Sequence, residues 1–237
     1  MEKYAKILGE AWPFHHLKPR DLLRIVNSGH LKRYRADSVI FLESEPGAGM
    51  FVLFSGKVHL YRYSAEGQTQ LIYTVKPTTM FNELTAIDDG PNPFTAIAVK
   101  DCLTWNIKTE SFQNLVKCYP DPTIGFALLR VLAMRTRLLL DQCEDLSFRS
   151  VLARVAKLIL KLSDDGLKTI DRQEYPIMDL AASIAVAPET ISRSLSSLND
   201  QGIISCTRKH ITVLEINPLL DAAQVKHRCI STSPKQI

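Results

Sequence analysis

Four polar residues between positions 189 and 196 have the types and spacing needed to read the edges of DNA bases. At 100° per residue in an α-helix, Glu189, Ser192, Arg193 and Ser196 share one outward face. Arginine donates two hydrogen bonds to guanine O6 and N7, and glutamate accepts one from the cytosine amino group. A simpler interpretation is that Glu189 and Arg193, four residues apart, form an exposed ion pair of the kind any surface helix can carry.

The opposite side of the same segment is apolar. Ile191, Leu195 and Leu198 fall together there, which is typical of a helix packed against a core. A shorter helix is predicted over Met178–Ala185, and the connection Val186-Ala187-Pro188 has the length of the turn in a helix-turn-helix motif. This context favours base recognition over the simple ion pair.

A strand–turn–strand wing is predicted after this helix. The strands Ile203–Cys206 and Ile211–Leu214 flank a basic turn. Basic and hydroxyl side chains suit contacts to DNA phosphates, which position a protein on the duplex without reading sequence. The predicted phosphate contacts are Thr190, Arg208, Lys209 and His210.

The elements that must position this unit lie earlier in the chain. Between about residues 31 and 107, short β-prone runs alternate with glycine and proline turns, which predicts an antiparallel sandwich or barrel. The runs are Val39–Leu42, Met50–Phe54, Val58–Tyr61, Leu71–Val75 and Ala96–Val99. A short helix is predicted before them, over Arg20–Ser28.

One long helix is predicted between the two regions, over Thr123–Phe148, opened by Tyr119–Pro122 because proline tolerates only the first turn of a helix. Leucines within it recur at spacings of four and seven, as on the seam of a coiled coil. The predicted seam is Leu128, Leu132, Leu139 and Leu146. We favour a dimerisation helix over a helix packed only on its own domain.

Composition limits the class of protein. The 237 residues include 46% apolar and 23% charged residues, as in an ordinary globular chain. Charge is mildly basic: 17 basic and 16 acidic residues precede Phe148, against 12 and 9 from there onward. The five scattered cysteines predict reduced thiols in the cytoplasm, and no apolar run reaches the roughly 20 residues of a membrane span. No motif suggests a catalytic residue, so an enzyme is not expected.

The run Pro188–Arg193, followed by Gly202-Ile203-Ile204, resembles the recognition segment of the cyclic-AMP receptor protein / fumarate-nitrate regulator (CRP/FNR) family of bacterial transcription regulators. The resemblance extends from about Phe14 to Pro218. The family's turn glycines and ligand cassette would lie at Ser55–Val58, Glu66-Gly67 and Asn82–Leu84.

Glu189, Ser192 and Arg193 are similar to the fumarate-nitrate regulator branch, which reads a palindrome with TTGA-type half-sites. The resemblance implies that Arg193 and Glu189 read the central G·C pair and that Ser192 reads the adjacent thymine.

The resemblance also indicates what the N-terminal domain does not bind. The family's cyclic-nucleotide cassette has Gly-Glu and, about ten residues later, Arg-Ser, whose guanidinium holds the cyclic phosphate. Here Glu83 is present, but Asn82 replaces the glycine and Pro93–Thr95 replaces the arginine and serine. Leu139 and Leu140 stand where the dimer helix has hydroxyls. Cyclic AMP is not expected in the usual mode, because a buried phosphate without its guanidinium costs several kcal/mol.

Three options for the effector stay open: haem, a small hydrophobic or aromatic molecule, or no effector. The predicted pocket lies between the β-domain and the long helix, at Phe81, Asn82, Glu83, Leu84, Phe94, Thr95, Leu132, Met134 and Leu139. Haem would use His15 or His16, with Cys102 and Cys118 as further candidates. An iron–sulfur cluster is not expected because no cysteine precedes Cys102, and no metal site is predicted.

The predicted fold is therefore α+β. An N-terminal antiparallel β-roll (1–115) senses the effector, a dimerisation helix (116–148) follows, then a winged helix-turn-helix (149–222) and a flexible tail (223–237). The expected partners are double-stranded DNA, a second copy of the chain, RNA polymerase and an unknown effector, with no membrane. The alternative is a ligand sensor or scaffold protein that uses the β-roll without binding DNA.

Overall fold

The computed structural model describes residues 1–12, 14–118 and 123–225. The chain forms two compact units, residues 1–67 with 72–137 and residues 68–71 with 138 onward. The predicted helix opening at Tyr119–Pro122 lies outside the described residues, as do residues 226–237 of the predicted tail. Within the described ranges, no helix is both long and apolar enough to cross a bilayer.

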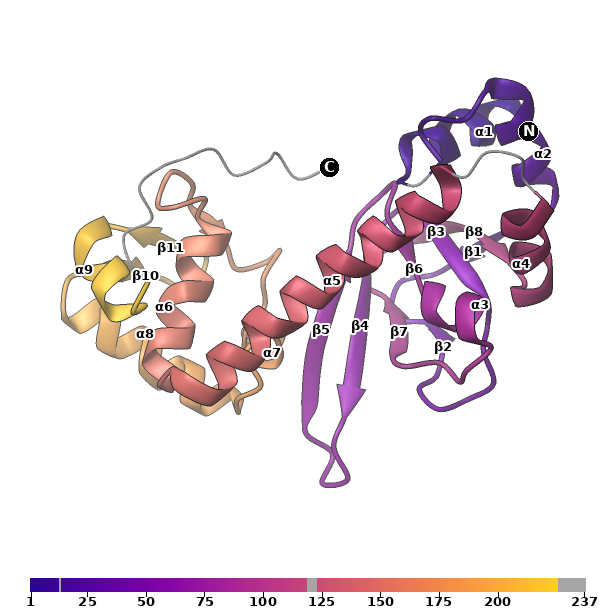
Figure 1. Ribbon diagram of the computed structural model, residues 1–237. Helices are drawn as coiled ribbons and strands as arrows, with labels where there is room; N and C mark the ends of the chain where they lie inside the picture. The colour runs from indigo at the N-terminus through magenta and orange to yellow at the C-terminus, as the bar shows by residue number, and fades with distance from the viewer. Residues whose placement is uncertain (13, 119–122, 226–237) are drawn as a thin grey trace. The chain divides into compact units, whose positions relative to one another are not determined.

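The N-terminal unit is an antiparallel β-roll with helices around it (Figure 1). Its two four-stranded sheets have the orders β1-β8-β3-β6 and β2-β7-β4-β5. The strands are β1 (His30–Tyr34), β2 (Val39–Phe41), β3 (Met50–Ser55), β4 (Val58–Tyr63), β5 (Thr69–Val75), β6 (Met80–Phe81), β7 (Thr95–Ala98) and β8 (Cys102–Ile107). The helices are α1 (Glu2–Glu10), α2 (Pro19–Asn27), α3 (Glu83–Asp88) and α4 (Thr109–Cys118). The predicted antiparallel β-domain is confirmed.

Aromatic side chains fill the inside of the roll. Phe41, Phe51 and Phe81 are buried together, with ring centroids 5.1–6.2 Å apart. The predicted turn at Ser55-Gly56 joins β3 to β4, and Gly56 has a φ of +97°. A Cβ there would lie 2.5 Å from the carbonyl oxygen of Asp101, so the turn requires glycine.

The long helix α5 has the predicted bounds, Thr123–Phe148. Its first half packs into the core of the N-terminal unit through Ile124, Leu128 and Val131. Leu128 is only 6% exposed. Its place on the predicted seam is therefore wrong, because its side chain is inside its own unit.

The C-terminal unit packs helices against a small sheet. The helices are α6 (Val151–Leu162), α7 (Ile177–Ser183), α8 (Pro188–Asp200) and α9 (Ile216–Ala222). The strands β9 (Ile170–Asp171), β10 (Ile204–Cys206) and β11 (His210–Val213) form an antiparallel sheet of order β10-β11-β9. The apolar faces of α6, α7, α8 and α9 meet in one core. The predicted winged helix-turn-helix is confirmed, with β9 as an additional strand.

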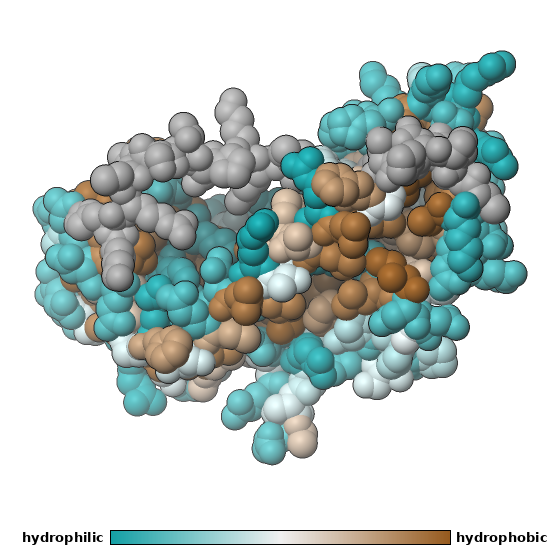
Figure 2. Space-filling view, in the orientation of Figure 1, coloured by the Kyte–Doolittle hydropathy of each residue, from teal (hydrophilic) through white to brown (hydrophobic). Residues whose placement is uncertain are grey.

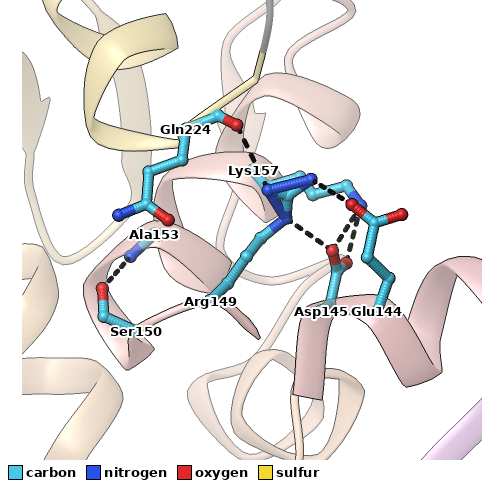
Figure 3. Close-up of polar contacts among 7 residues, drawn as sticks. All are labelled: Glu144, Asp145, Arg149, Ser150, Ala153, Lys157 and Gln224. Atoms are coloured by element: carbon cyan, nitrogen blue, oxygen red, sulfur yellow. Dashed lines mark hydrogen bonds and ion pairs between the residues drawn. The ribbon is translucent and has the colours of Figure 1, made fainter. Parts of the chain in front are cut away.

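An ionic network holds the corner between α5 and α6 (Figure 3). The Asp145 carboxylate accepts from Arg149 Nε at 2.7 Å and from Lys157 Nζ at 2.6 Å. Arg149 also pairs with Glu144 and donates to the backbone oxygen of Gln224 at 3.2 Å. The last residues of α5 are thus tied to the C-terminal unit.

The predicted tail begins too early. Ala223 is fully buried and Val225 packs against the same core. Residues 223–225 therefore belong to the folded unit, because the apolar side chains after α9 complete its packing.

Candidate nucleic-acid interface and effector region

The turn between α7 and α8 fixes the angle at which α8 leaves the unit. Ala185 has a φ of +52°, a left-handed conformation more common for glycine. Arg154 of α6 supports this turn by donating from Nη1 to the Ile184 carbonyl at 2.7 Å. Pro188 then begins α8 at its first turn, where the missing N–H costs no hydrogen bond.

The polar face of α8 points to solvent. Glu189, Ser192, Arg193 and Ser196 are all exposed. Among the described residues, neither Glu189 nor Arg193 has an ion-pair partner, so the simpler interpretation as a surface pair is not what the structure contains. Ser192 donates its hydroxyl to the Pro188 carbonyl at 2.9 Å, and its oxygen can still accept a hydrogen bond from another donor. The charged groups of this face are therefore available to a ligand.

The apolar back of α8 is sealed. Ile191, Leu195 and Leu198 are buried in the core of the C-terminal unit. On the front, Ser192, Arg193 and Ser196 line one open depression together with Ser197 and Asp200. Glu189 lies one turn nearer the N-terminus of the helix.

The wing presents its basic turn outward. The Thr207 hydroxyl accepts from the backbone N–H of His210 at 3.0 Å and from that of Lys209 at 3.3 Å, which closes the turn. Arg208, Lys209 and His210 are exposed as a result. Thr190, the other predicted phosphate contact, is half-buried near the N-terminus of α8.

In the β-roll, the residue that replaces the expected glycine is built into a buried network. Asn82 takes a left-handed φ of +61°. Its amide nitrogen donates to the Gly49 carbonyl at 2.9 Å and to the Asn92 side-chain oxygen at 3.0 Å. Asn92 in turn donates to the Leu42 carbonyl at 3.0 Å. These amides are used within the fold.

Glu83, the acid of the predicted cassette, is 1% exposed and forms an ion pair with Arg135 of α5. Arg135 also donates from Nη2 to the Met80 carbonyl at 2.5 Å, and its guanidinium lies 5.5 Å from the centroid of the Tyr73 ring. Burial raises the pKa of Glu83, and the charge of Arg135 and hydrogen bonds oppose that rise. The sequence reasoning missed Arg135 as a site residue, although a charged residue interrupting an apolar helix was a usable signal.

The other predicted pocket residues do not share one environment. Phe81 belongs to the aromatic core, Thr95 is buried and accepts from the Glu43 backbone N–H at 3.0 Å, and Leu84 is exposed on α3. Phe94 and Leu132 are half-buried, and Met134 is exposed. Leu139 is exposed on the part of α5 that belongs to the C-terminal unit. Within the N-terminal unit, the predicted pocket residues therefore divide between the buried core and the exposed surface.

The surroundings of His15 and His16 do not fit haem. Both are exposed on the connection between α1 and α2, with their ring centroids 4.1 Å apart. Trp12 lies beside them and is covered on its face by Arg130, 4.8 Å away. A porphyrin needs an enclosed apolar site and these residues are open to water. The side chains of Cys118 and Cys229 lie outside what the structure describes.

Apolar side chains are exposed along α5 (Figure 2). Three strongly exposed ones lie on a face different from that of the predicted seam. Phe126, Leu129 and Leu140 are 65%, 62% and 62% exposed. They lie within an arc of about 60° at 100° per residue. Ala133 and Cys143 continue the same heptad spacing and are exposed too.

The fold and site together define a two-domain DNA-binding regulator: an N-terminal β-roll, a long helix and a winged helix-turn-helix with an open polar face. Residues 31–119 match the cyclic nucleotide-binding domain family, and residues 153–222 match the Crp-like helix-turn-helix domain family. The chain belongs to the CRP/FNR family of transcription regulators.

Its relatives are similar over most of their length. The CRP-like cAMP-activated global transcriptional regulator of Mycobacterium tuberculosis is 25% identical over 224 residues, covering 92% of this chain and 99% of the relative. The cyclic AMP receptor protein of Thermus thermophilus is 28% identical over 191 residues, covering 81% and 87%.

Solved structures share the fold. The c-di-GMP responsive global regulator CLP of Xanthomonas campestris superposes with a TM-score of 0.71 at 19% identity, covering 83% of this chain and 99% of that one. These relatives are regulators rather than enzymes, and the match of a DNA-binding family over residues 153–222 disfavours the scaffold alternative.

Proposed function

We propose that this protein is a homodimeric transcription regulator that reads a palindrome with TTGA-type half-sites through α8. Arg193 donates to guanine, Glu189 accepts from the paired cytosine, and Ser192 contacts the adjacent thymine. The observation that carries this proposal is the exposed, unpaired state of Glu189 and Arg193 on a helix with a buried apolar back. Ser196 extends the readout face by one turn, and the basic wing anchors phosphates.

A gel-shift titration tests the base contacts. We expect Arg193→Ala to lose about 1–3 kcal/mol of discrimination between a TTGA half-site and one with its G·C pair inverted. Arg208→Ala is the matched control, because loss of a phosphate contact weakens both duplexes alike. Equal binding of the two duplexes by the unaltered protein would contradict the proposal.

The dimer is proposed to form along the exposed stripe of α5, namely Phe126, Leu129, Ala133, Leu140 and Cys143. Heptad spacing keeps such a stripe in register with its copy in a partner helix, and two-fold symmetry then places two recognition helices on one palindrome. RNA polymerase is the expected protein partner, and the cytoplasm the expected location.

Substitution of two neighbouring leucines distinguishes a dimer formed along this stripe from one formed along the seam predicted by leucine spacing. Leu140 lies on the exposed stripe, and Leu139 lies about 100° away on the predicted seam. Leu140→Asp should give monomers on a sizing column that no longer bind the palindrome, whereas Leu139→Asp should remain dimeric. The reverse result would restore the predicted seam. Mild oxidation should also link two chains through Cys143 if it faces its copy.

For the effector, we infer that cyclic AMP does not bind in the usual mode. Pro93, Phe94 and Thr95 supply no guanidinium for a cyclic phosphate, and Glu83 already has a cationic partner in Arg135. Calorimetric titration of the purified protein with cyclic AMP should show no saturable heat, and DNA binding should not change when it is added. Micromolar binding would overturn this inference. A small hydrophobic effector or a roll without an effector remains the proposal.

A further inference from the structure

Two adjacent histidines lie side by side on the turn that joins α1 to α2, outside the regions used by the proposed function. His15 and His16 are exposed, and the centroids of their imidazole rings are 4.1 Å apart, with the ring planes tilted by 39°. In the part of the chain that the structure describes, neither ring takes part in a hydrogen bond or an ion pair. Their ring nitrogens are therefore available to an external ligand.

Buried anchors on both sides hold the backbone of this turn. Phe14 is fully buried and meets Trp105 edge to face, with ring centroids 6.3 Å apart, and Leu17 is buried directly after the pair. The Leu17 backbone N–H donates to the Phe14 carbonyl at 3.0 Å and closes the turn between the two anchors. The folded chain thus places both imidazoles next to each other at the surface before any ligand arrives, which lowers the cost of binding.

The chemistry of two neighbouring imidazoles favours a transition-metal ion. Neutral imidazole is the commonest protein ligand for such ions, and affinity for a given nitrogen site is highest for Cu²⁺. Two nitrogens bonded to one ion lie about 3 Å apart, which the rings of His15 and His16 reach by small side-chain rotations. Among the described residues, no third histidine, cysteine or carboxylate completes a metal-binding group. Water would therefore fill the other positions, as the tetragonal geometry of Cu²⁺ allows.

We propose that His15 and His16 bind one Cu²⁺ ion at the surface of the N-terminal unit. Ni²⁺ binds the same pair more weakly, and Mg²⁺ and Ca²⁺ do not bind it, because they require oxygen ligands. The site needs neither helix α8 nor a DNA duplex. It therefore stands or falls separately from the proposed function.

Trp12 lies beside the pair and gives the site its own optical signal. The centroid of its ring is 6.0 Å from that of His15 and 6.4 Å from that of His16. Bound Cu²⁺ is paramagnetic and quenches the fluorescence of an indole at such short range. The other tryptophan of the chain, Trp105, is buried and donates from Nε1 to the Val26 carbonyl at 3.0 Å. We expect copper to quench the emission of Trp12 much more than that of Trp105.

Arg130 of α5 provides a second signature of the site. Its guanidinium lies 4.8 Å from the centroid of the Trp12 ring, so a positive charge is already held close to the pair. That charge repels a bound divalent cation. Arg130→Gln should therefore strengthen Cu²⁺ binding a few-fold at low salt, and the gain should shrink as salt rises. Arg137→Gln, which removes an exposed charge from the same helix, is the matched control and should leave binding unchanged.

The test is a titration of the full chain, without an affinity tag, with CuCl₂ in a buffer that does not bind metals. Tryptophan fluorescence should fall saturably with one ion per chain. His15→Gln and His16→Gln should each weaken binding by at least about tenfold, because even the loss of a partner behind a metal ligand costs about 10–100-fold. His30→Gln, which removes an exposed histidine from β1, is the control and should leave the titration unchanged. Quenching that is unsaturable, or equal in the double variant His15→Gln/His16→Gln, would overturn the proposal.

Two further measurements separate metal binding from a change in the fold. Trp12→Phe should lose most of the fluorescence response but still bind one Cu²⁺ ion in calorimetry. The electron paramagnetic resonance spectrum of the copper-loaded protein should show splitting from imidazole nitrogen, and the double variant should lose it while its urea midpoint stays the same. A copper spectrum without nitrogen splitting in the unaltered protein would overturn the proposal. Failure to prefer a TTGA half-site would instead count only against the proposed function.

Discussion

The N-terminal unit and helix α8 each contain a pair formed by a glutamate and an arginine, and the two pairs differ in burial and in whether they form an ion pair. Glu83 is buried and its partner Arg135 is supplied by the same unit. Glu189 and Arg193 are exposed and, in the described part of the chain, have no ion-pair partner. A buried charge that is neutralised within the fold must lose its partner before it can bind a ligand. An exposed charge only exchanges its water molecules for the ligand, which costs little.

The difference indicates that the first pair contributes to stability, whereas the second pair is free to serve the DNA recognition proposed for it. A buried carboxylate without its cation is strongly destabilising, because its desolvation is no longer compensated. An exposed side chain away from such features changes stability by about 0.5 kcal/mol or less. We therefore expect the loss of one charge of the buried pair to lower the stability of the protein, and variants of the exposed pair to change only what it binds.

The largest effect should come from Arg135→Ala. The loss of the cation beside buried Glu83 should lower the free energy of unfolding by about 3–5 kcal/mol in urea titrations. The double variant Glu83→Gln/Arg135→Met removes both charges and should recover most of that loss. Arg193→Ala, the exposed counterpart, should unfold like the unaltered protein. Equal stability of the two single variants would break the comparison.

A smaller effect is expected for Glu189→Gln, now in DNA binding rather than stability. Under the proposed function, the amide replaces a carboxylate that accepts a hydrogen bond from the cytosine amino group, so discrimination at that base should fall by about 1–3 kcal/mol. Competition gel shifts with the four possible base pairs at this position measure it. Glu215→Gln, an exposed glutamate before α9, is the control. A change of equal size in the control would show that net charge, not base contact, is responsible.

The ion pairs at the corner between α5 and α6 should contribute to stability by an amount between those of the buried and the exposed pair. Asp145 is partly exposed and holds both Arg149 and Lys157. Asp145→Asn should cost about 1 kcal/mol of stability, and less as salt rises. The control is Asp164→Asn, because Asp164 pairs with Lys168 and is more exposed than Asp145. It should cost about a few tenths of a kcal/mol. If Asp145→Asn cost no more stability than this control, the ion pairs at the corner would contribute no more than an ordinary exposed pair.

Local periodicity explains which elements could be predicted. The two faces of α8 follow from 3.6-residue spacing within one segment. The bounds of α5 follow from a proline-free stretch after a proline-containing opening. The two-residue strands β6 and β9 are too short to carry a pattern, and β9 is defined only by its pairing with β11.

The features that were predicted wrongly or missed share one cause, because each of them is determined by tertiary packing. Leucine spacing placed Leu128 on a dimer seam, but the first half of α5 uses that face for its own unit. The contact between Glu83 and Arg135 joins residues 52 positions apart, and the left-handed turn at Asn82 depends on buried amide partners such as Asn92. No local pattern encodes such contacts.

The pH dependence of stability provides the last and finest test of the buried pair. Burial raises the pKa of Glu83 in the folded protein above that of the unfolded chain, so the folded state binds this proton more tightly. The resulting stabilisation is complete below the pKa of Glu83 in the unfolded chain, about 4.3. It is lost as pH rises through the pKa of Glu83 in the folded protein.

The free energy of unfolding of the unaltered protein, minus that of Glu83→Gln, should therefore decrease as pH rises from about 4 and then level off once Glu83 is ionised. Urea titrations across that range measure the difference. On an Arg135→Met background, the decrease should continue to higher pH, because the cation that opposes the effect of burial is gone. A difference that increases with pH would mean that attraction to Arg135 outweighs desolvation, and that this carboxylate resembles an ordinary paired acid.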